Sequence, residues 1–336
     1  MKIVYYVHDL TFPVREGVRS QTWWLAQEMK KKDYDVEIVS TSKKSEIEIK
    51  NGIKITYGSA FAISSVKTDI LHYMSHPSPL IVPLMLRTRA RRQFMTIFDG
   101  YLNGFWKRLW SHALKALVNS KLRAVTLQTD YQMRLWKKTN CTIESVKIAP
   151  LLPSFEPRQH RSFHPTILFM SHLHEYKGIH DVIDAYNILR KKIKGLRLIV
   201  ADSGITQNRS AYKRLLHLSR RGDIIMKKIV QPNIELAHAW VYVYPVRHPQ
   251  ETFSIPLSLI EAQQVGTPSI STAVGGIPEY FRSEMLVPPK NPEALARKIE
   301  DFIESPSVYP LKQEIKNVDV VESFARLYEL GARQRY

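Results

Sequence analysis

The chain has 336 residues, 44% hydrophobic and 24% charged, which is enough for about two globular domains that each bury a core. Forty-nine Lys and Arg against 31 Asp and Glu give a formal net charge of +18, which favours anionic partners such as nucleic acid, acidic lipid or phosphorylated small molecules. A single cysteine, Cys141, excludes a disulfide framework and favours a reducing compartment. The N-terminal apolar run breaks at His8-Asp9, too early for a signal peptide, and the longest apolar run, 79–86, is far short of the roughly 18 residues of a membrane span. We therefore expect a cytoplasmic protein that is soluble or lies on a membrane surface.

The first half of the chain reads as alternating strands and helices. A buried strand, a loop containing glycine, a helix and a second strand form a βαβ unit. Apolar and polar residues then alternate on both sides of Asn51-Gly52, which predicts a β-hairpin. The predicted elements are strands at 2–7 and 36–41, a helix at 20–32, and further buried strands at 94–98 and 124–128.

Prolines and polar residues at 149–165 break the periodicity and predict a linker, after which the α/β pattern restarts. Asn291 and Pro292 are typical of the N-cap and first residue of a helix. The chain ends in a predicted amphipathic helix whose apolar stripe is Val321, Phe324, Ala325, Tyr328 and Ala332. The other predicted elements are a strand at 166–170, a helix at 179–192 and strands within 196–204, 223–230, 240–246 and 268–276. Two consecutive doubly wound halves explain this order most economically.

The loops that follow strands are the places to look for a ligand site, because doubly wound sheets bind ligands beyond the carboxyl ends of their strands. The sequence has neither the GxGxxG nor the GxxxxGK[ST] signature. In the loop SHLHEYKG (171–178), Lys177 stands two residues before the predicted helix start at Ile179. Its ammonium and the helix dipole can then face one phosphate group, although a lysine in such a loop can equally be only solvated.

The stretch ETFSIPLSLIEAQQVGTP (251–268) is apolar apart from a few positions, two of them glutamates. Ser254 is the predicted N-cap of a helix that begins near Ile255, and Gly266 is its predicted end. Because this helix is apolar nearly all round, it is expected to be buried, and Glu261 then lies in an enclosed place. A buried carboxylate needs hydrogen-bond donors, which can be a structural Arg or Lys or the vicinal hydroxyls of a ribose.

Several stretches of this chain resemble the retaining nucleotide-sugar glycosyltransferases of family four. They are ETFSIPLSLIEAQQVGTPSISTAVGGIPE, HPTILFMSHLHEYKGIHDVIDAYNIL, RLIVADSG, WVYVYP and EGVRSQTWWLAQEMKKKDYDVEIVS, and TIFDG and AVTLQTDYQMRLW stand where the family has its later N-domain motifs. The resemblance implies an α/β fold of GT-B type, with two doubly wound Rossmann-like domains facing across a cleft and a C-terminal helix that crosses back. We expect an acceptor-side domain at 1–152, a nucleotide-sugar domain at 153–316, and a helix at 317–336 that packs on the first domain.

The resemblance also implies roles for individual residues. Glu261 aligns with the glutamate that accepts the nucleotide ribose hydroxyls, Lys177 with the lysine that holds the donor diphosphate, and Gly17 with a loop glycine that approaches the donor. Gly275 and Gly276 match a glycine pair of the donor domain. The expected donor-binding set is completed by Glu251, Thr252, Phe253, Ser254 and Ile255.

The sequence departs from the family pattern at four places. Glu251 precedes Glu261 by ten residues instead of eight, and Phe253 stands at the usual glutamate position; we expect Glu251 still to reach the donor hexose. His172 replaces the arginine of the cationic loop, with Arg247 or His248 expected to assist it. The remaining departures are Phe98 in place of a histidine, which leaves Asp99 as the polar candidate there, and Glu16 in place of the first loop glycine. The expected catalytic residues are Lys177, His172, Glu251 and Asp99.

The expected reaction moves a hexose from a UDP- or GDP-linked donor to an acceptor hydroxyl with retention, without a protein nucleophile. No Asp-x-Asp motif is present, so neither a metal nor a cofactor besides the donor substrate is expected. Residues 81–140 hold twelve Lys and Arg against two acidic residues, and the amphipathic stretch 100–118 is either a membrane-interface segment or an ordinary core helix. The first reading favours a lipid-linked glycan acceptor and peripheral binding to an anionic membrane through the basic N-terminal domain.

Two alternatives stay open from the sequence. One is a soluble glucan synthase or a phosphorylase-like transferase. The other is a basic nucleic-acid-binding protein that uses 87–94 as a phosphate patch, although no helix-turn-helix, zinc-knuckle or RNP pattern accompanies it, and nucleic acid is not an expected partner.

Overall fold

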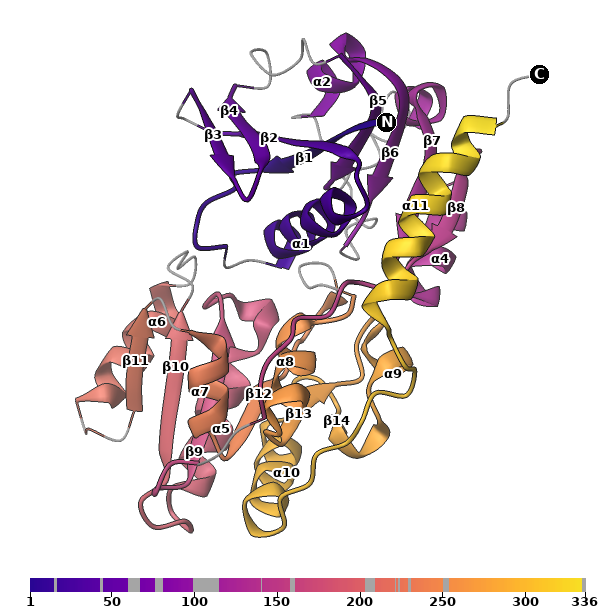
Figure 1. Cartoon of the computed structure of the whole chain (residues 1–336). Coiled ribbons are helices and arrows are strands. Elements are labelled where there is room, and N and C mark those ends of the chain that lie inside the picture. Colours follow the sequence, from indigo (N-terminus) through magenta and orange to yellow (C-terminus); the bar gives the residue numbers. More distant parts are fainter. Residues whose placement is uncertain are drawn as a thin grey trace. The chain divides into compact units, whose positions relative to one another are not determined.

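The computed structural model describes residues 1–14, 17–42, 45–59, 67–75, 81–98, 115–139, 141–157, 161–202, 209–220, 222, 224–228, 231–249 and 254–333. The chain folds into two compact units, one of Met1–Leu151 with Ile315–Tyr336 and one of Leu152–Glu314 (Figure 1). Most of the basic stretch 100–118 lies outside the described residues. In the described ranges, no helix combines the length and hydrophobicity that a membrane span requires.

The first unit is built on an eight-stranded sheet with the order β3-β4-β2-β1-β5-β6-β7-β8. Only β3 runs antiparallel to its neighbour, and the pairs from β4 to β8 are parallel. Its elements are β1 (Lys2–His8), α1 (Gly17–Lys31), β2 (Asp35–Thr41), β3 (Glu46–Lys50), β4 (Ile53–Gly58), β5 (Lys67–Met74), α2 (Val82–Arg87), β6 (Arg89–Thr96), β7 (Leu122–Leu127), α4 (Asp130–Lys137), β8 (Glu144–Lys147) and α11 (Asn317–Arg333).

The local predictions for this unit hold where the signal is short-ranged. Asn51 and Gly52 both have positive φ, 49° and 71°, as the predicted tight hairpin turn between β3 and β4 requires. Strand β6 begins at Arg89, well before the predicted 94, and its first four residues alternate in exposure. The arginines of 87–94 therefore lie mainly on a strand of the sheet, and Arg92 donates through Nη1 to the Tyr328 carbonyl at 2.9 Å.

Helix α11 packs on the first unit through the predicted stripe, of which Val321, Phe324, Ala325 and Tyr328 are buried. The Tyr328 hydroxyl lies 2.5 Å from Nδ1 of His72, whose Nε2 lies 2.8 Å from the Thr96 hydroxyl. Burial lowers the pKa of His72 to about 3, so this imidazole is neutral. The C-terminal helix is thus fixed by both apolar packing and a buried polar chain.

The second unit has a six-stranded, fully parallel sheet with the order β11-β10-β9-β12-β13-β14. Its elements are β9 (Thr166–Ser171), the 3₁₀ helix η3 (Glu175–Lys177), α5 (Ile179–Leu189), β10 (Arg197–Asp202), α6 (Arg209–Ser219), β11 (Ile224–Lys228), α7 (Pro232–His238), β12 (Val241–Tyr244), α8 (Leu257–Val265), β13 (Ser269–Thr272), α9 (Ile277–Tyr280), the 3₁₀ helix η5 (Ser283–Met285), β14 (Leu286–Val287) and α10 (Pro292–Glu304). The first strand, β9, lies inside the sheet, so the chain winds away from it in both directions.

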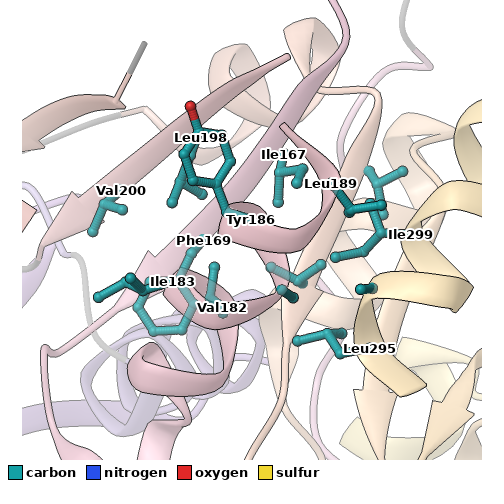
Figure 2. Close-up of a cluster of buried hydrophobic side chains, with 14 of the residues drawn as sticks. Ile167, Phe169, Val182, Ile183, Tyr186, Leu189, Leu198, Val200, Leu295 and Ile299 are labelled. Carbon is teal, nitrogen blue, oxygen red and sulfur yellow. The ribbon is translucent and has the colours of Figure 1, made fainter. Parts of the chain in front are cut away.

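The core of the second unit lies between the sheet and two helices. Figure 2 shows α5 side chains against those of β9, β10 and α10. Asn291 caps α10 as predicted, since its side chain accepts from the Ala294 backbone N–H at 2.9 Å, and Pro292 is the first helical residue. The buried residues labelled in Figure 2 are Ile167, Phe169, Val182, Ile183, Tyr186, Leu189, Leu198, Val200, Leu295 and Ile299. This core holds the carboxyl ends of β9 and β12 in fixed positions.

Candidate functional site

The strand order of the second unit creates a switch point between β9 and β12. The connections from these neighbouring strands lead to opposite sides of the sheet, and such a point leaves a crevice beyond the carboxyl ends of the two strands. The loop 172–178 follows β9, and the chain from Pro245 to Pro256 follows β12. These two connections carry most of the predicted donor-site residues.

Lys177 lies at this crevice, at the end of η3 and two residues before the start of α5. The residue is only 9% exposed, and its Nζ donates to the Tyr244 hydroxyl at the end of β12, at 3.0 Å. The His174 side chain caps the start of η3 by accepting from the Tyr176 backbone N–H at 3.3 Å. A largely buried ammonium next to the N-terminus of α5 is an arrangement suited to an anion such as phosphate.

Hydroxyl groups at the carboxyl end of β13 form hydrogen bonds with the backbone where β12 ends and its loop begins. Ser271 Oγ donates to the Tyr244 carbonyl at 2.8 Å, and Thr272 Oγ1 donates to the Val246 carbonyl at 2.5 Å. These contacts were not predicted, although a run of small hydroxyl residues at the carboxyl end of a buried strand is a usable signal. They hold the backbone next to Lys177 in one conformation.

The other expected cations of the loop have different surroundings. Arg247 forms a bidentate pair with Asp181 of α5, at 2.8 and 2.6 Å, and this hydrogen bonding raises the pKa of Arg247. The His248 ring lies 5.8 Å from the Tyr176 ring. His172 is partly exposed, and its carbonyl accepts from the His174 backbone N–H at 2.7 Å. Arg247 was expected to assist His172 at the phosphate. Its guanidinium is instead already paired with the Asp181 carboxylate.

Helix α8 begins two residues later than predicted. Its N-cap is Pro256, with φ −63° and ψ 115°, and Ser254 makes no cap. The reason is that a residue before proline, here Ile255, is sterically disfavoured in helical conformation. Gly266 ends the helix with φ 82°, as predicted. Ser254 and Ile255, which precede the helix, are buried. No residue of α8 is exposed, which confirms that the helix is enclosed.

Glu261 of α8 has an unusual carboxyl group. The residue is mostly buried, and burial raises its pKa from 4.5 to about 7. Among the described residues, none donates a hydrogen bond to this carboxyl or forms an ion pair with it. The group lies near Tyr242 of β12, whose pKa is raised by burial and, to a smaller extent, by Tyr244 and Glu261, and whose hydroxyl donates to Ser258 Oγ at 2.7 Å. The sequence left two kinds of hydrogen-bond donor open for Glu261, a structural Arg or Lys and the hydroxyls of a ribose. The described residues supply no such Arg or Lys.

The remaining predicted residues divide between the two units and the undescribed positions. Gly275, with φ 61°, follows β13, and Gly276 is the N-cap of α9, so both lie at the same sheet edge as Lys177. Gly17 is the first residue of α1 in the first unit. Phe98 of that unit is buried. Glu16, Asp99, Glu251, Thr252 and Phe253 lie outside the described residues.

Residues 154–318 match the family model of the glycosyl transferases group 1. This part of the chain is a glycosyl transferases group 1 domain. The domain covers the second unit, which contains Lys177, Glu261, Gly275 and Gly276.

Curated relatives agree with this assignment. The chain is 27% identical over 180 residues to the putative colanic acid biosynthesis glycosyltransferase of Salmonella typhimurium, with 49% of this chain and 44% of the relative covered. It is 26% identical over 197 residues to an uncharacterized glycosyltransferase of Haemophilus influenzae, with 56% of this chain and 53% of the relative covered. The matches thus span about half the length of these relatives.

Solved structures show the fold of the whole chain. An Anabaena protein in complex with UDP-glucose has a TM-score of 0.77 at 12% identity, with 98% of this chain and 100% of that chain covered. The pneumococcal O-GlcNAc transferase in complex with UDP and GlcNAc has a TM-score of 0.75 at 10% identity, with 99% of each chain covered. The predicted α/β fold with two Rossmann-like domains, GT-B, is confirmed.

Proposed function

We propose that the protein is a retaining hexosyltransferase that takes a hexose from a UDP- or GDP-linked donor. The observation that carries the proposal is the placement of a buried ammonium, Lys177, and a carboxyl without a described partner, Glu261, on the two elements that border β12 at the switch point. A nucleoside diphosphate offers the matching groups, an anionic diphosphate and a pair of ribose hydroxyls. The solved structures with UDP or UDP-glucose bound support the same class of ligand.

The donor would bind with its diphosphate at Lys177 and its ribose at Glu261. Two O–H donors of a ribose match the two oxygens of a carboxylate, and they supply the hydrogen bonds that the described chain does not provide. Glu251 would contact the hexose, and the remaining donor contacts would come from Gly17, Thr252, Phe253, Ser254, Ile255, Gly275 and Gly276.

The chemistry would consist mainly of electrostatic stabilisation of the leaving diphosphate. As the bond between the anomeric carbon and the diphosphate oxygen breaks, negative charge grows on the phosphate, where Lys177, His172 and the N-terminus of α5 stabilise it. The acceptor hydroxyl attacks from the same face, and a phosphate oxygen takes its proton, so no protein nucleophile is needed. Asp99 is the polar candidate near the reacting sugar. Neither a metal nor another cofactor has a role in this mechanism.

We propose a lipid-linked or membrane-associated glycan as the acceptor, with the protein bound peripherally to the cytoplasmic face of the membrane. Exposed cations on the first unit support an anionic surface partner. They include Arg87, Arg89, Arg91, Lys121 and Arg123. Relatives named for colanic acid biosynthesis also favour a glycan product over a nucleic acid complex. A soluble glucan acceptor is the alternative.

A two-step experiment tests this proposal. Calorimetric titrations with UDP, GDP and ADP identify the nucleotide, with Lys177→Met and Glu261→Gln as variants that are expected to bind it more weakly. Labelled sugar nucleotides of the preferred base are then incubated with lipid extracts and, separately, with soluble glucan. If none of the nucleotides binds the wild type, or both variants bind as the wild type does, the donor-site assignment is wrong. Transfer to glucan alone would replace the lipid-linked acceptor by the soluble one.

A further inference from the structure

Arg247 and Asp181 form a buried link between the two loops of the site. The guanidinium donates from Nε and Nη2 to the two oxygens of Asp181, at 2.8 and 2.6 Å, and Asp181 is 3% exposed in the first turn of α5. The Arg247 backbone N–H also donates to the Tyr176 carbonyl at 2.8 Å. Nη1 lies 3.7 Å from Glu175. Arg247, a single residue in the loop after β12, therefore holds both the backbone of η3 and the start of α5.

The two loops also meet backbone to backbone beside this link. Gly178 has φ 79°, and a Cβ placed on it would lie 1.9 Å from the Pro245 carbonyl oxygen. Lys177 stands between Gly178 and Tyr176, and its Nζ reaches the Tyr244 hydroxyl. The position of the Lys177 ammonium therefore depends on how closely the loop after β9 is held against the loop after β12.

We infer that Arg247 is a positioning residue, which sets the place of the Lys177 ammonium through Asp181 and the Tyr176 carbonyl and does not itself bind the donor. This inference rests on the proposed function of Lys177 as the diphosphate ligand. The competing hypothesis is that Arg247 binds the phosphate directly as a second cation, as its basic side chain near the crevice suggests. That role requires Arg247 to leave a nearly fully buried carboxylate, which would then lack its counter-charge and two hydrogen bonds.

Substitution of Asp181 separates the two roles. If Arg247 is a phosphate ligand, Asp181→Asn releases its charge, and nucleoside diphosphate affinity stays the same or rises. If Arg247 acts through Asp181, then Asp181→Asn and Arg247→Ala each lower the affinity for UDP by about tenfold. The double variant then binds UDP no more weakly than the single variant that has the lower affinity. Arg247→Lys, which keeps the charge but not the two-pronged geometry, restores only part of the loss. UDP is the probe, or GDP if the wild type does not bind UDP.

The Lys177→Met background distinguishes positioning from general destabilisation. There, Arg247→Ala is expected to cause no further loss of UDP affinity, because the group that it positions is absent. The matched control is the ion pair between Arg214 of α6 and Asp184, which is also on α5 and is partly exposed. Arg214→Ala should leave UDP affinity unchanged. Circular dichroism and thermal unfolding show that each variant is folded.

Unchanged or tighter UDP binding by Asp181→Asn, or an additive loss in the Lys177→Met and Arg247→Ala double variant, overturns the positioning role and leaves the proposed function intact. Lys177→Met and Glu261→Gln variants that both bind UDP as the wild type does overturn the proposed function itself. The two failures are therefore distinguishable within one set of titrations.

Discussion

The raised pKa of Glu261 predicts that nucleotide binding weakens as the pH falls through about 7. Ribose hydroxyls donate hydrogen bonds, so they bind the ionised carboxylate and lose an acceptor when the group is protonated. An ordinary glutamate, with a pKa near 4.5, would stay ionised throughout this range. The direction of the effect therefore separates an enclosed Glu261 from a solvated one.

The size of the effect follows from the ionised fraction of Glu261. With a pKa of about 7, this fraction falls from about 90% at pH 8 to about 10% at pH 6, so the affinity for UDP should fall by about tenfold between these values. The terminal phosphate of UDP also takes up a proton in this range, which adds to the loss of affinity. Glu261→Gln removes only the carboxyl contribution, so the difference between the wild type and this variant isolates it.

Calorimetric titration of both proteins with UDP at pH 6, 7 and 8 is the appropriate assay. The wild type should bind more tightly than Glu261→Gln at pH 8, and the two affinities should converge at pH 6. Parallel pH profiles would refute the reasoning, because they would show that ionisation of Glu261 does not contribute to binding. Equal affinity of both proteins at pH 8 would refute the ribose contact itself.

Three further predictions concern stability. Because the folded protein holds the Glu261 proton more tightly than the unfolded chain, the free energy of unfolding of the apo protein should fall by at most about 3 kcal/mol as the pH rises from 4.5 to 7. Thermal unfolding at pH 5 and 8 should show this loss in the wild type but not in Glu261→Gln. Gly178→Ala should lower the midpoint of thermal unfolding strongly, since its Cβ would overlap the Pro245 carbonyl; a wild-type midpoint would contradict the close approach. Tyr328→Phe should cost about 1–3 kcal/mol in urea unfolding, because buried His72 loses a hydrogen-bond partner, and an unchanged midpoint would argue against this contact.

The fold was predictable where short stretches carry the signal. Buried parallel strands such as β1 read as apolar runs, and the hairpin turn at Asn51-Gly52 depends on two adjacent residues. Strand β5 was missed although it pairs with both β1 and β6. Its sequence contains Thr68, Asp69 and His72, which interrupt an apolar pattern. His72 is acceptable in the core only because Tyr328, 256 residues away in the sequence, and Thr96 supply its hydrogen bonds.

The site was predictable in its ligand-facing candidates but not in its supporting contacts. Lys177 and Glu261 stand out because one precedes a helix start and the other interrupts an apolar helix. Nothing local links Asp181 to Arg247, which is 66 residues away, and the same is true of Arg92, whose guanidinium binds the carbonyl of Tyr328. A count of basic residues therefore overestimates the cations available to a phosphate, because it cannot separate those that the fold already uses.

The partners of the two cations give a physical basis for their separate roles. Arg247 is held by two charge-assisted hydrogen bonds to a buried carboxylate, so an incoming phosphate would have to replace an equal charge and leave Asp181 unpaired. Lys177 donates to the Tyr244 hydroxyl, and its place directly before Gly178, the N-cap of α5, lets a phosphate face both the ammonium and the helix N-terminus. The Arg247–Asp181 pair would stay closed and keep the loop in place when the phosphate binds. The two cations therefore contribute differently: Arg247 acts through the carboxylate that it binds, and Lys177 through its place beside the helix N-terminus.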